Sequence, residues 1–176
     1  NIESIMQDLL EKRKQSGTYR SLKILDSKAH DFTSNDYLGL AKIDFLSGED
    51  HSFIDNGAGG SRLLSGNKAY HVEAEAFMAD YFNAESCLLF NSGYVANLGL
   101  LSSVPQKGDA ILMDELSHIC IKEGARLSRA SHFNFRHNDL EDLQKKLNTV
   151  NANNIFMVVE SIYSMDGDEA PLVDIV

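Results

Sequence analysis

The sequence contains no tryptophan, only two prolines and only two cysteines, and it lacks any long apolar run. The two cysteines, Cys87 and Cys120, cannot build the dense disulfide framework of a small secreted domain, and their apolar neighbours predict buried, reduced thiols. No stretch of about 18 apolar residues is present, so no transmembrane helix is expected. The N-terminal segment mixes apolar and charged residues, which is not typical of a signal peptide. Together these absences favour a cytoplasmic protein.

Basic residues are also scarce relative to acidic ones. The chain has 16 Lys and Arg residues against 26 Asp and Glu residues, and its formal net charge is −10. A nucleic-acid-binding protein needs a basic surface to displace counterions, and an anionic membrane repels an acidic protein. The six histidines show no metal-ligand spacing. The sequence therefore predicts no nucleic-acid partner, no membrane partner and no metal site.

The periodicity of the apolar residues predicts a globular α/β protein. Apolar residues at helical spacing predict helices over 2–15 and 70–82, and short apolar runs around a turn predict strands over 22–25 and 30–33. From residue 86 onward, predicted strands and helices alternate. In chain order these elements are strand 86–90, helix 95–104, strand 110–113, helix 119–129, strand 132–135, helix 140–150 and strand 155–160.

Such alternation is typical of a mostly parallel sheet with helices covering its faces. A length of 176 residues suits one domain with its own core. We expect an N-terminal helix and arm over residues 1–44, followed by the α/β domain over residues 45–176. The arm carries too little apolar surface to fold alone, so it is expected to pack against other protein.

The glycine-rich segment GAGGSRLLSG covers residues 57–66. It has neither the dinucleotide-binding pattern G-x-G-x-x-G between a strand and a helix nor the G-K-[ST] of a phosphate-binding P-loop. Two interpretations remain open. The segment is a flexible connector, or it is a loop whose backbone approaches a ligand or a partner subunit.

The segment NSGYVAN, residues 91–97, follows a predicted strand and opens a predicted helix. The free backbone N–H groups at the start of that helix, those of Gly93 and Tyr94, are placed to bind an anion. Gly93 permits close approach, and Ser92 can cap the helix or donate to a phosphate. A plain helix cap and a phosphate site are both consistent with this pattern.

Other polar residues follow the predicted strands or lie in loops. His118 lies at a strand-to-helix junction, where it caps the helix or stacks on a planar ring. Glu160, Ser164 and their neighbours follow the last predicted strand, and ligands gather at that edge of an open α/β sheet. Asn35 lies in a loop flanked by apolar residues and suits an Asx-turn.

Five motifs in order resemble one known family. These are NDYLGL (35–40), GAGGSRLLSGN (57–67), SGYVAN (92–97), DELSHICIKEGA (114–125) and VVESIYSMDGDEAPL (158–172). Their order and spacing are similar to those of the α-oxoamine synthases, which are pyridoxal-phosphate enzymes of transferase fold type I. Within this family the motifs most resemble the 8-amino-7-oxononanoate synthase branch. The resemblance implies a partial three-layer α/β/α large domain and pyridoxal 5′-phosphate as cofactor.

The resemblance also implies roles for single residues. Gly93 and Tyr94 would hold the cofactor phosphate, together with Ser92. His118 would be catalytic, stacking on the pyridine ring and contacting substrate. The remaining positions are Ser164 near the phenolic oxygen, Glu160 at the strand end beneath it, Asn35 for the amino-acid carboxylate and Arg20 toward the acyl thioester.

The implied reaction is a decarboxylative condensation of an amino acid with an acyl-CoA or acyl-carrier thioester, with L-alanine and a pimeloyl thioester as the expected pair. A homodimer with a shared active site is implied, with loop 57–66 near its interface. No lysine of the chain matches the family's Schiff-base lysine, so the 176 residues are expected to be an inactive fragment of the enzyme. The alternatives are a short, non-catalytic paralogue that pairs with a full-length synthase, and another activity within the family, that of a serine palmitoyltransferase or a 2-amino-3-ketobutyrate ligase.

Overall fold

The computed structural model describes residues 2–26, 28–43 and 56–176. They form two compact units, one of which joins the residues up to Met6 with Phe90–Val176, while the other lies between Gln7 and Leu89. The domain boundary expected at residue 45 falls outside the described residues and stays a prediction.

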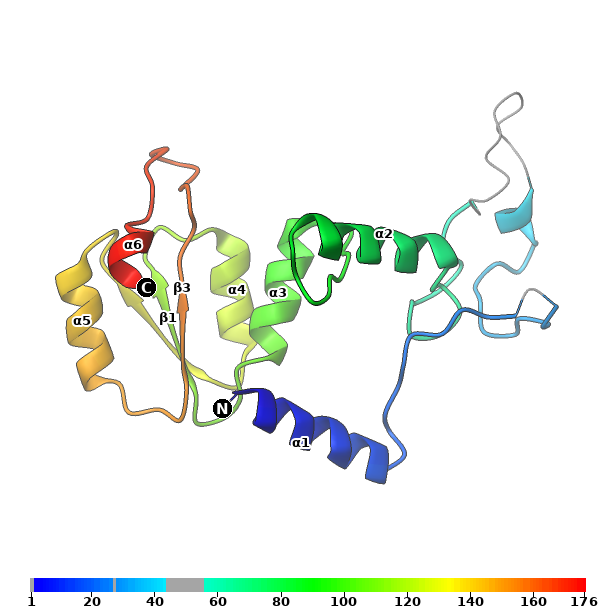
Figure 1. Ribbon diagram of the computed structural model, residues 1–176, viewed down its shortest axis with the longest axis horizontal. Coiled ribbons are helices and arrows are strands. Elements are labelled where there is room, and N and C mark those ends of the chain that lie inside the picture. The colour runs from blue at the N-terminus through cyan, green and yellow to red at the C-terminus, as the bar shows by residue number, and fades with distance from the viewer. Residues whose placement is uncertain (1, 27, 44–55) are drawn as a thin grey trace. The chain divides into compact units, whose positions relative to one another are not determined.

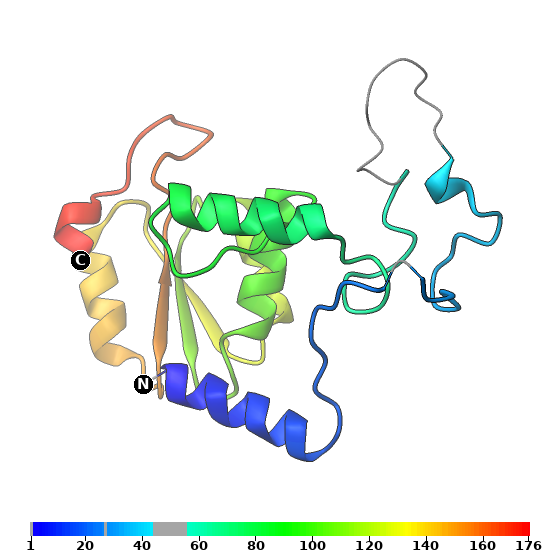
Figure 2. The same ribbon diagram turned by 45° about the vertical axis from the view of Figure 1, so that its right-hand side comes forward.

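The larger unit is built on a parallel sheet of three strands, β1 (Ala110–Asp114), β2 (Ser131–Phe135) and β3 (Ile155–Val158), in the order β2-β1-β3. Its helices are α3 (Gly93–Ser103), α4 (Ile119–Leu127), α5 (Leu140–Thr149) and the short α6 (Leu172–Ile175). Figures 1 and 2 show α5 on one side of the sheet and α3 and α4 on the other. The predicted α/β class and its parallel sheet are confirmed.

The central strand β1 is buried along its whole length and separates two small cores. On one face, Ile111 and Met113 pack with residues of α3 and α4, among them Leu101 and Ile121. On the other face, Leu112 packs with Phe135 and with Leu143 of α5. Alternate side chains of one strand thus fill both interfaces of a three-layer structure.

The close packing of α3 against α4 depends on a glycine. A Cβ atom at Gly124 would lie 2.9 Å from Cβ of Leu101 and 3.2 Å from the backbone oxygen of Asn97. The absence of a side chain at this position lets the backbone of α4 pack closely against the backbone of α3. This contact fixes the N-terminal ends of α3 and α4 relative to each other.

The second unit contains most of α1 (Ile2–Gln15), the 3-10 turn η1 (Leu40–Lys42) and α2 (Ala69–Tyr81). Both long helices were predicted from their periodicity. None of the helices among the described residues combines the length and the apolar character needed to cross a bilayer.

Two of the predicted strands, 22–25 and 30–33, are wrong, because neither described segment forms a strand. The side chain of Asp31 accepts hydrogen bonds from the backbone N–H groups of Thr33 and Ser34 at 2.8 and 3.2 Å. Local bonds of this kind offer the backbone an alternative to a sheet ladder.

The predicted strand 86–90 is also wrong. The N–H of Leu89 donates to the Glu75 carboxylate at 2.8 Å, so a side chain of α2 takes the place of a neighbouring strand. The cysteine prediction holds in part, since both thiols are free, but only Cys120 is buried and Cys87 is half-buried.

Candidate functional site

Six of the predicted site residues lie in the larger unit, around the ends of its strands. Ser92 is the N-cap of α3, and its Oγ accepts a hydrogen bond from Val95 N at 3.2 Å. The N–H groups of Gly93 and Tyr94 belong to the first turn, where a helix has no carbonyl partner for them. A Cβ built at Gly93 would meet nothing within 4 Å, so the space beside the first residue of this helix is open.

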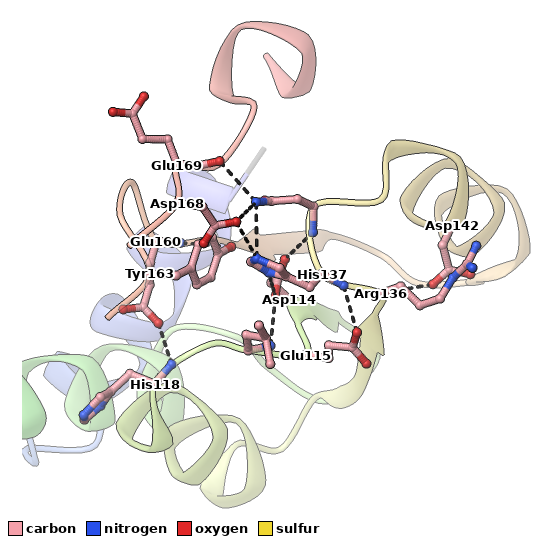
Figure 3. Close-up of polar contacts among 12 residues, drawn as sticks. Asp114, Glu115, His118, Arg136, His137, Asp142, Glu160, Tyr163, Asp168 and Glu169 are labelled. Carbon is pink, nitrogen blue, oxygen red and sulfur yellow. Dashed lines mark hydrogen bonds and ion pairs between the residues drawn. The ribbon is translucent and has the colours of Figure 1, made fainter. Parts of the chain in front are cut away.

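His118 is the N-cap of α4, and its ring faces Tyr94 edge-on with centroids 6.3 Å apart. Its backbone N–H donates to Oε1 of Glu160 at 2.5 Å, which joins the loop after β1 to the end of β3. Figure 3 shows this bond and the imidazole of His118 pointing away from the other labelled polar groups. Two helix N-termini, one imidazole and one carboxylate therefore lie together at one edge of the sheet.

Ser164 lies beyond Glu160 in the loop of residues 161–170, where it is exposed to solvent. The other two predicted residues, Asn35 and Arg20, belong to the second unit. The backbone N–H of Asn35 donates to the carbonyl oxygen of Gly59 at 2.6 Å, so Asn35 contacts the glycine-rich loop. The functional roles of these residues stay predictions.

The glycine-rich loop is compact. A Cβ at Gly66 would collide with the carbonyl group of Gly60, so the loop closes on itself at this point. Arg62 anchors it, because its guanidinium donates to Glu75 Oε1 at 2.6 Å, to Glu75 Oε2 at 2.9 Å and to Asn67 Oδ1. Arg62, to which the sequence assigned no role, thus ties the loop to α2.

The ion pair between Arg62 and Glu75, here called the clasp, predicts that the stability of the second unit falls in acid. The hydrogen bond from Arg62, more than any other interaction, lowers the pKa of Glu75 from 4.5 to about 2. A lowered carboxylate pKa stabilises the fold above the unfolded value and loses that effect as the pH falls toward the folded value. Glu75→Gln is expected to remove on the order of 2–3 kcal/mol of stability at pH 7 and to flatten its decline below pH ~4.5.

Urea denaturation of wild type and Glu75→Gln between acidic and neutral pH measures this effect. Glu73→Gln, an exposed change on the same helix, is the matched control and is expected to shift the unfolding free energy by under about 0.5 kcal/mol. Equal stability of the Glu75→Gln and Glu73→Gln proteins at pH 7 would show that the clasp carries no stability.

A buried network that no sequence pattern predicts lies beside the predicted site. His137, just after β2, is bonded through Nδ1 to Asp114 at 2.9 Å and through Nε2 to Asp168 at 2.7 Å. Asp114 is fully buried at the end of β1 and also accepts from the N–H groups of Leu116 and Asn138. Figure 3 shows that this network joins the loops after all three strands.

The pKa shifts in the network favour a protonated His137 and an ionised Asp114. The hydrogen bond to Asp114, followed by that to Asp168, raises the pKa of His137. Burial raises the pKa of Asp114, but the bonds from Asn138, Leu116 and His137 outweigh burial and lower it. Burial raises the pKa of Tyr163, whose ring packs edge-on against His137, to about 12, so this residue remains a neutral phenol.

The ligand atoms of His137, Asp166 and Asp168 lie within 4.8 Å of one another. This spacing would suit a cation, but both ring nitrogens of His137 already contact carboxylates and Asp166 is exposed at the loop tip. The ion pair accounts for the arrangement. The network's contribution is to hold the loop that carries Ser164 against the end of the sheet.

Comparison with known proteins gives a match to the family model "Aminotransferase class I and II" over residues 27–176. The 8-amino-7-oxononanoate synthase of Emericella nidulans is 42% identical over 191 residues, which covers 97% of this chain and 46% of the relative. The 8-amino-7-oxononanoate synthase 2 of Bacillus subtilis is 38% identical over 190 residues, covering 99% and 51%. The chain spans about half the length of the curated relatives that it matches.

Among solved structures, a serine palmitoyltransferase variant from S. paucimobilis with a bound PLP–myriocin aldimine superposes with a TM-score of 0.66 at 28% identity, covering 96% of this chain and 47% of that one. These matches confirm the resemblance to the α-oxoamine synthases. They also confirm the predicted fold class, a partial large domain of the pyridoxal-phosphate-dependent transferase fold.

Proposed function

Because the chain belongs to the aminotransferase class I and II family, we propose that it supplies the phosphate-binding and ring-facing part of a pyridoxal 5′-phosphate site. The observation that carries this proposal is the convergence of the open helix end at Gly93 with His118 and Glu160 at one edge of the sheet. The named relatives support it, because the S. paucimobilis structure contains the cofactor.

The residues present fit this cofactor. A phosphate would accept hydrogen bonds from the N–H groups of Gly93 and Tyr94 and gain from the positive end of the α3 dipole. The open space beside Gly93 is consistent with close approach of a phosphate to this helix end. The ring of His118, exposed and beside Tyr94, offers a face to the planar pyridine, and Glu160 fixes the backbone of His118.

When bound, pyridoxal phosphate supplies an electron sink for the carbanion formed at the substrate's α-carbon. The chain's own residues bind and orient. Gly93 and Tyr94 hold the phosphate, His118 presents its imidazole to cofactor and substrate, and Ser164 lies on the loop that the Asp114–His137–Asp168 network fixes.

We propose that the whole protein is a C-acyltransferase that condenses an amino acid with an acyl thioester and releases carbon dioxide. L-Alanine and a pimeloyl thioester are the proposed substrates, since curated relatives carry the name 8-amino-7-oxononanoate synthase. Asn35 would bind the amino-acid carboxylate. A homodimer with a shared site is part of the same proposal.

In the second unit, a cavity of about 480 Å³ is lined by Leu10, Arg13, Thr18, Tyr19, Arg20 and Leu63. The apolar part of this mixed lining suits an alkyl chain, and the two arginines in it suit an anionic group such as a carboxylate or phosphate. This chemistry supports the assignment of Arg20 to the acyl thioester.

No lysine of the 176 residues is proposed as the covalent cofactor ligand. Lys122, which follows His118 by one helical turn, is engaged elsewhere, because its ammonium donates to the Glu115 carbonyl oxygen at 2.6 Å. The chain by itself is therefore expected to bind the cofactor without a covalent bond and to show no turnover.

Two measurements test the proposal. The whole protein is expected to release carbon dioxide with L-alanine and pimeloyl-CoA faster than with L-serine and palmitoyl-CoA, and the reverse preference would overturn the substrate assignment. Borohydride treatment of the 176-residue chain with pyridoxal phosphate is expected to leave its mass unchanged. Stoichiometric addition of the cofactor to one lysine would contradict the non-covalent assignment.

A further inference from the structure

The thiol of Cys120 contacts the His118 imidazole from inside the fold. Its Sγ lies 2.9 Å from Nδ1 of His118, and the backbone N–H of Cys120 donates to the same nitrogen at 3.2 Å. Cys120 is only 2% exposed, whereas His118 is exposed. Cys120 thus contacts the imidazole at Nδ1 on its inner side, while Nε2 lies on the outer side of the ring.

The polarity of these contacts follows from the backbone bond. A backbone N–H can only donate, so Nδ1 of His118 is the acceptor in this bond, and the thiol contact at 2.9 Å adds to it. A neutral imidazole that accepts at Nδ1 carries its proton on Nε2. The thiol, facing the same lone pair, must then act as an S–H donor.

Asn97 completes the arrangement from the neighbouring helix. Its side-chain Nδ2 donates to Sγ of Cys120 at 3.2 Å, so the sulfur accepts one bond while it donates another. Such chains of bonds polarise one another. Because Asn97 belongs to α3, the chain from Asn97 through Cys120 to His118 runs from the helix that starts at Gly93 to the imidazole.

We propose that Cys120 and Asn97 are positioning residues that hold His118 as the Nε2–H tautomer. The outward N–H is then a fixed hydrogen-bond donor for an oxygen of the bound substrate or cofactor. The identity of the oxygen that accepts from this N–H rests on the proposed function. The tautomer itself depends only on contacts within the polypeptide. Cys120 is in this account a proton donor to Nδ1 and not a nucleophile.

The test is ¹⁵N NMR of the His118 imidazole in the whole protein, before and after saturation with pyridoxal phosphate. Wild type is expected to show the unprotonated signal for Nδ1 and the protonated signal for Nε2. Cys120→Ser retains a donor and is expected to keep this pattern. Cys120→Val removes the side-chain donor at similar volume and leaves only the backbone bond at 3.2 Å, so part of the population is expected to move to Nδ1–H, with turnover falling about 3- to 10-fold.

Cys87→Val is the matched control, because Cys87 is the other free cysteine and touches neither Asn97 nor His118 in the contacts described. A protonated Nδ1 in wild type, or an unchanged tautomer in a folded Cys120→Val protein, would overturn the proposal. If Cys120→Val shifts the tautomer but leaves turnover unchanged, the positioning inference stands and the role proposed for His118 in the reaction fails.

Discussion

Replacing Asp114 by alanine is expected to destabilise the fold by about 3–5 kcal/mol, because it removes one partner of a buried ion pair. The Asp114 side chain is fully buried and accepts from Leu116 N, Asn138 N and His137 Nδ1. Its loss would leave two backbone donors and Nδ1 of the His137 imidazolium without their acceptor, while Nε2 keeps Asp168. Urea denaturation at pH 6, monitored by circular dichroism, measures the loss.

The pH dependence of the unfolding free energy distinguishes a contribution of this ion pair from one of side-chain packing. The pKa of His137 is raised, so the pair stabilises the fold below the ordinary histidine value and this effect is lost as the pH rises through the raised pKa. Wild type is expected to lose stability over that range, and Asp114→Ala is expected to lose less, because only the bond to Asp168 then raises the pKa of His137. Asp166→Ala, an exposed change in the neighbouring loop, is expected to cost under about 0.5 kcal/mol. A cost below about 1 kcal/mol for Asp114→Ala would contradict the ion-pair account.

Replacing Gly93 by aspartate is expected to weaken binding of pyridoxal phosphate to the whole protein by at least ~100-fold, or about 3 kcal/mol. The new side chain would extend into the open space beside position 93, and its carboxylate would repel the cofactor phosphate at the α3 N-terminus. The same carboxylate favours the helix, since an acidic group in the first turn stabilises it by about 0.3–1 kcal/mol. The fold is therefore expected to survive while affinity falls, which a fluorescence titration and a thermal melt measure together.

Gly93→Ala is the control for this change. Gly93 is not among the glycines with positive φ, so alanine can adopt its backbone conformation, and its Cβ would meet nothing within 4 Å. We expect at most about a 10-fold loss of affinity for this variant, because no charge is introduced. Equal affinity of wild type and Gly93→Asp would exclude a phosphate at this helix end.

The alternating half of the fold could be predicted from the sequence because its signals are local. The apolar run at 110–113 predicts β1, and the amphipathic patterns that follow predict α4 and α5, with bounds that differ from the observed ones by at most two residues. Ser92 correctly marked a helix start, although α3 begins at Gly93 and not at Val95. Local pattern was misleading at 86–90, where the bond from Leu89 N to Glu75 replaces a sheet ladder.

The Asp114–His137–Asp168 network could not be predicted from spacing, since its members lie 23 and 31 residues apart. One signal was available. His137 follows β2 as His118 follows β1, and the carboxyl ends of parallel strands share one edge of the sheet. Applying that rule to every strand would have brought His137 and Asp114 together. The contact of Cys120 with His118 depends on side-chain orientation at the α4 N-terminus, which sequence does not reveal.

Mapping the backbone amides that respond to the cofactor tests the central claim most directly. In a ¹⁵N chemical-shift titration of the chain with pyridoxal 5′-phosphate, the account predicts that the amides of Gly93 and Tyr94 move most, and that pyridoxal without its phosphate moves them far less. Shifts confined to the glycine-rich loop, or equal responses to both compounds, would contradict a phosphate site at the start of α3.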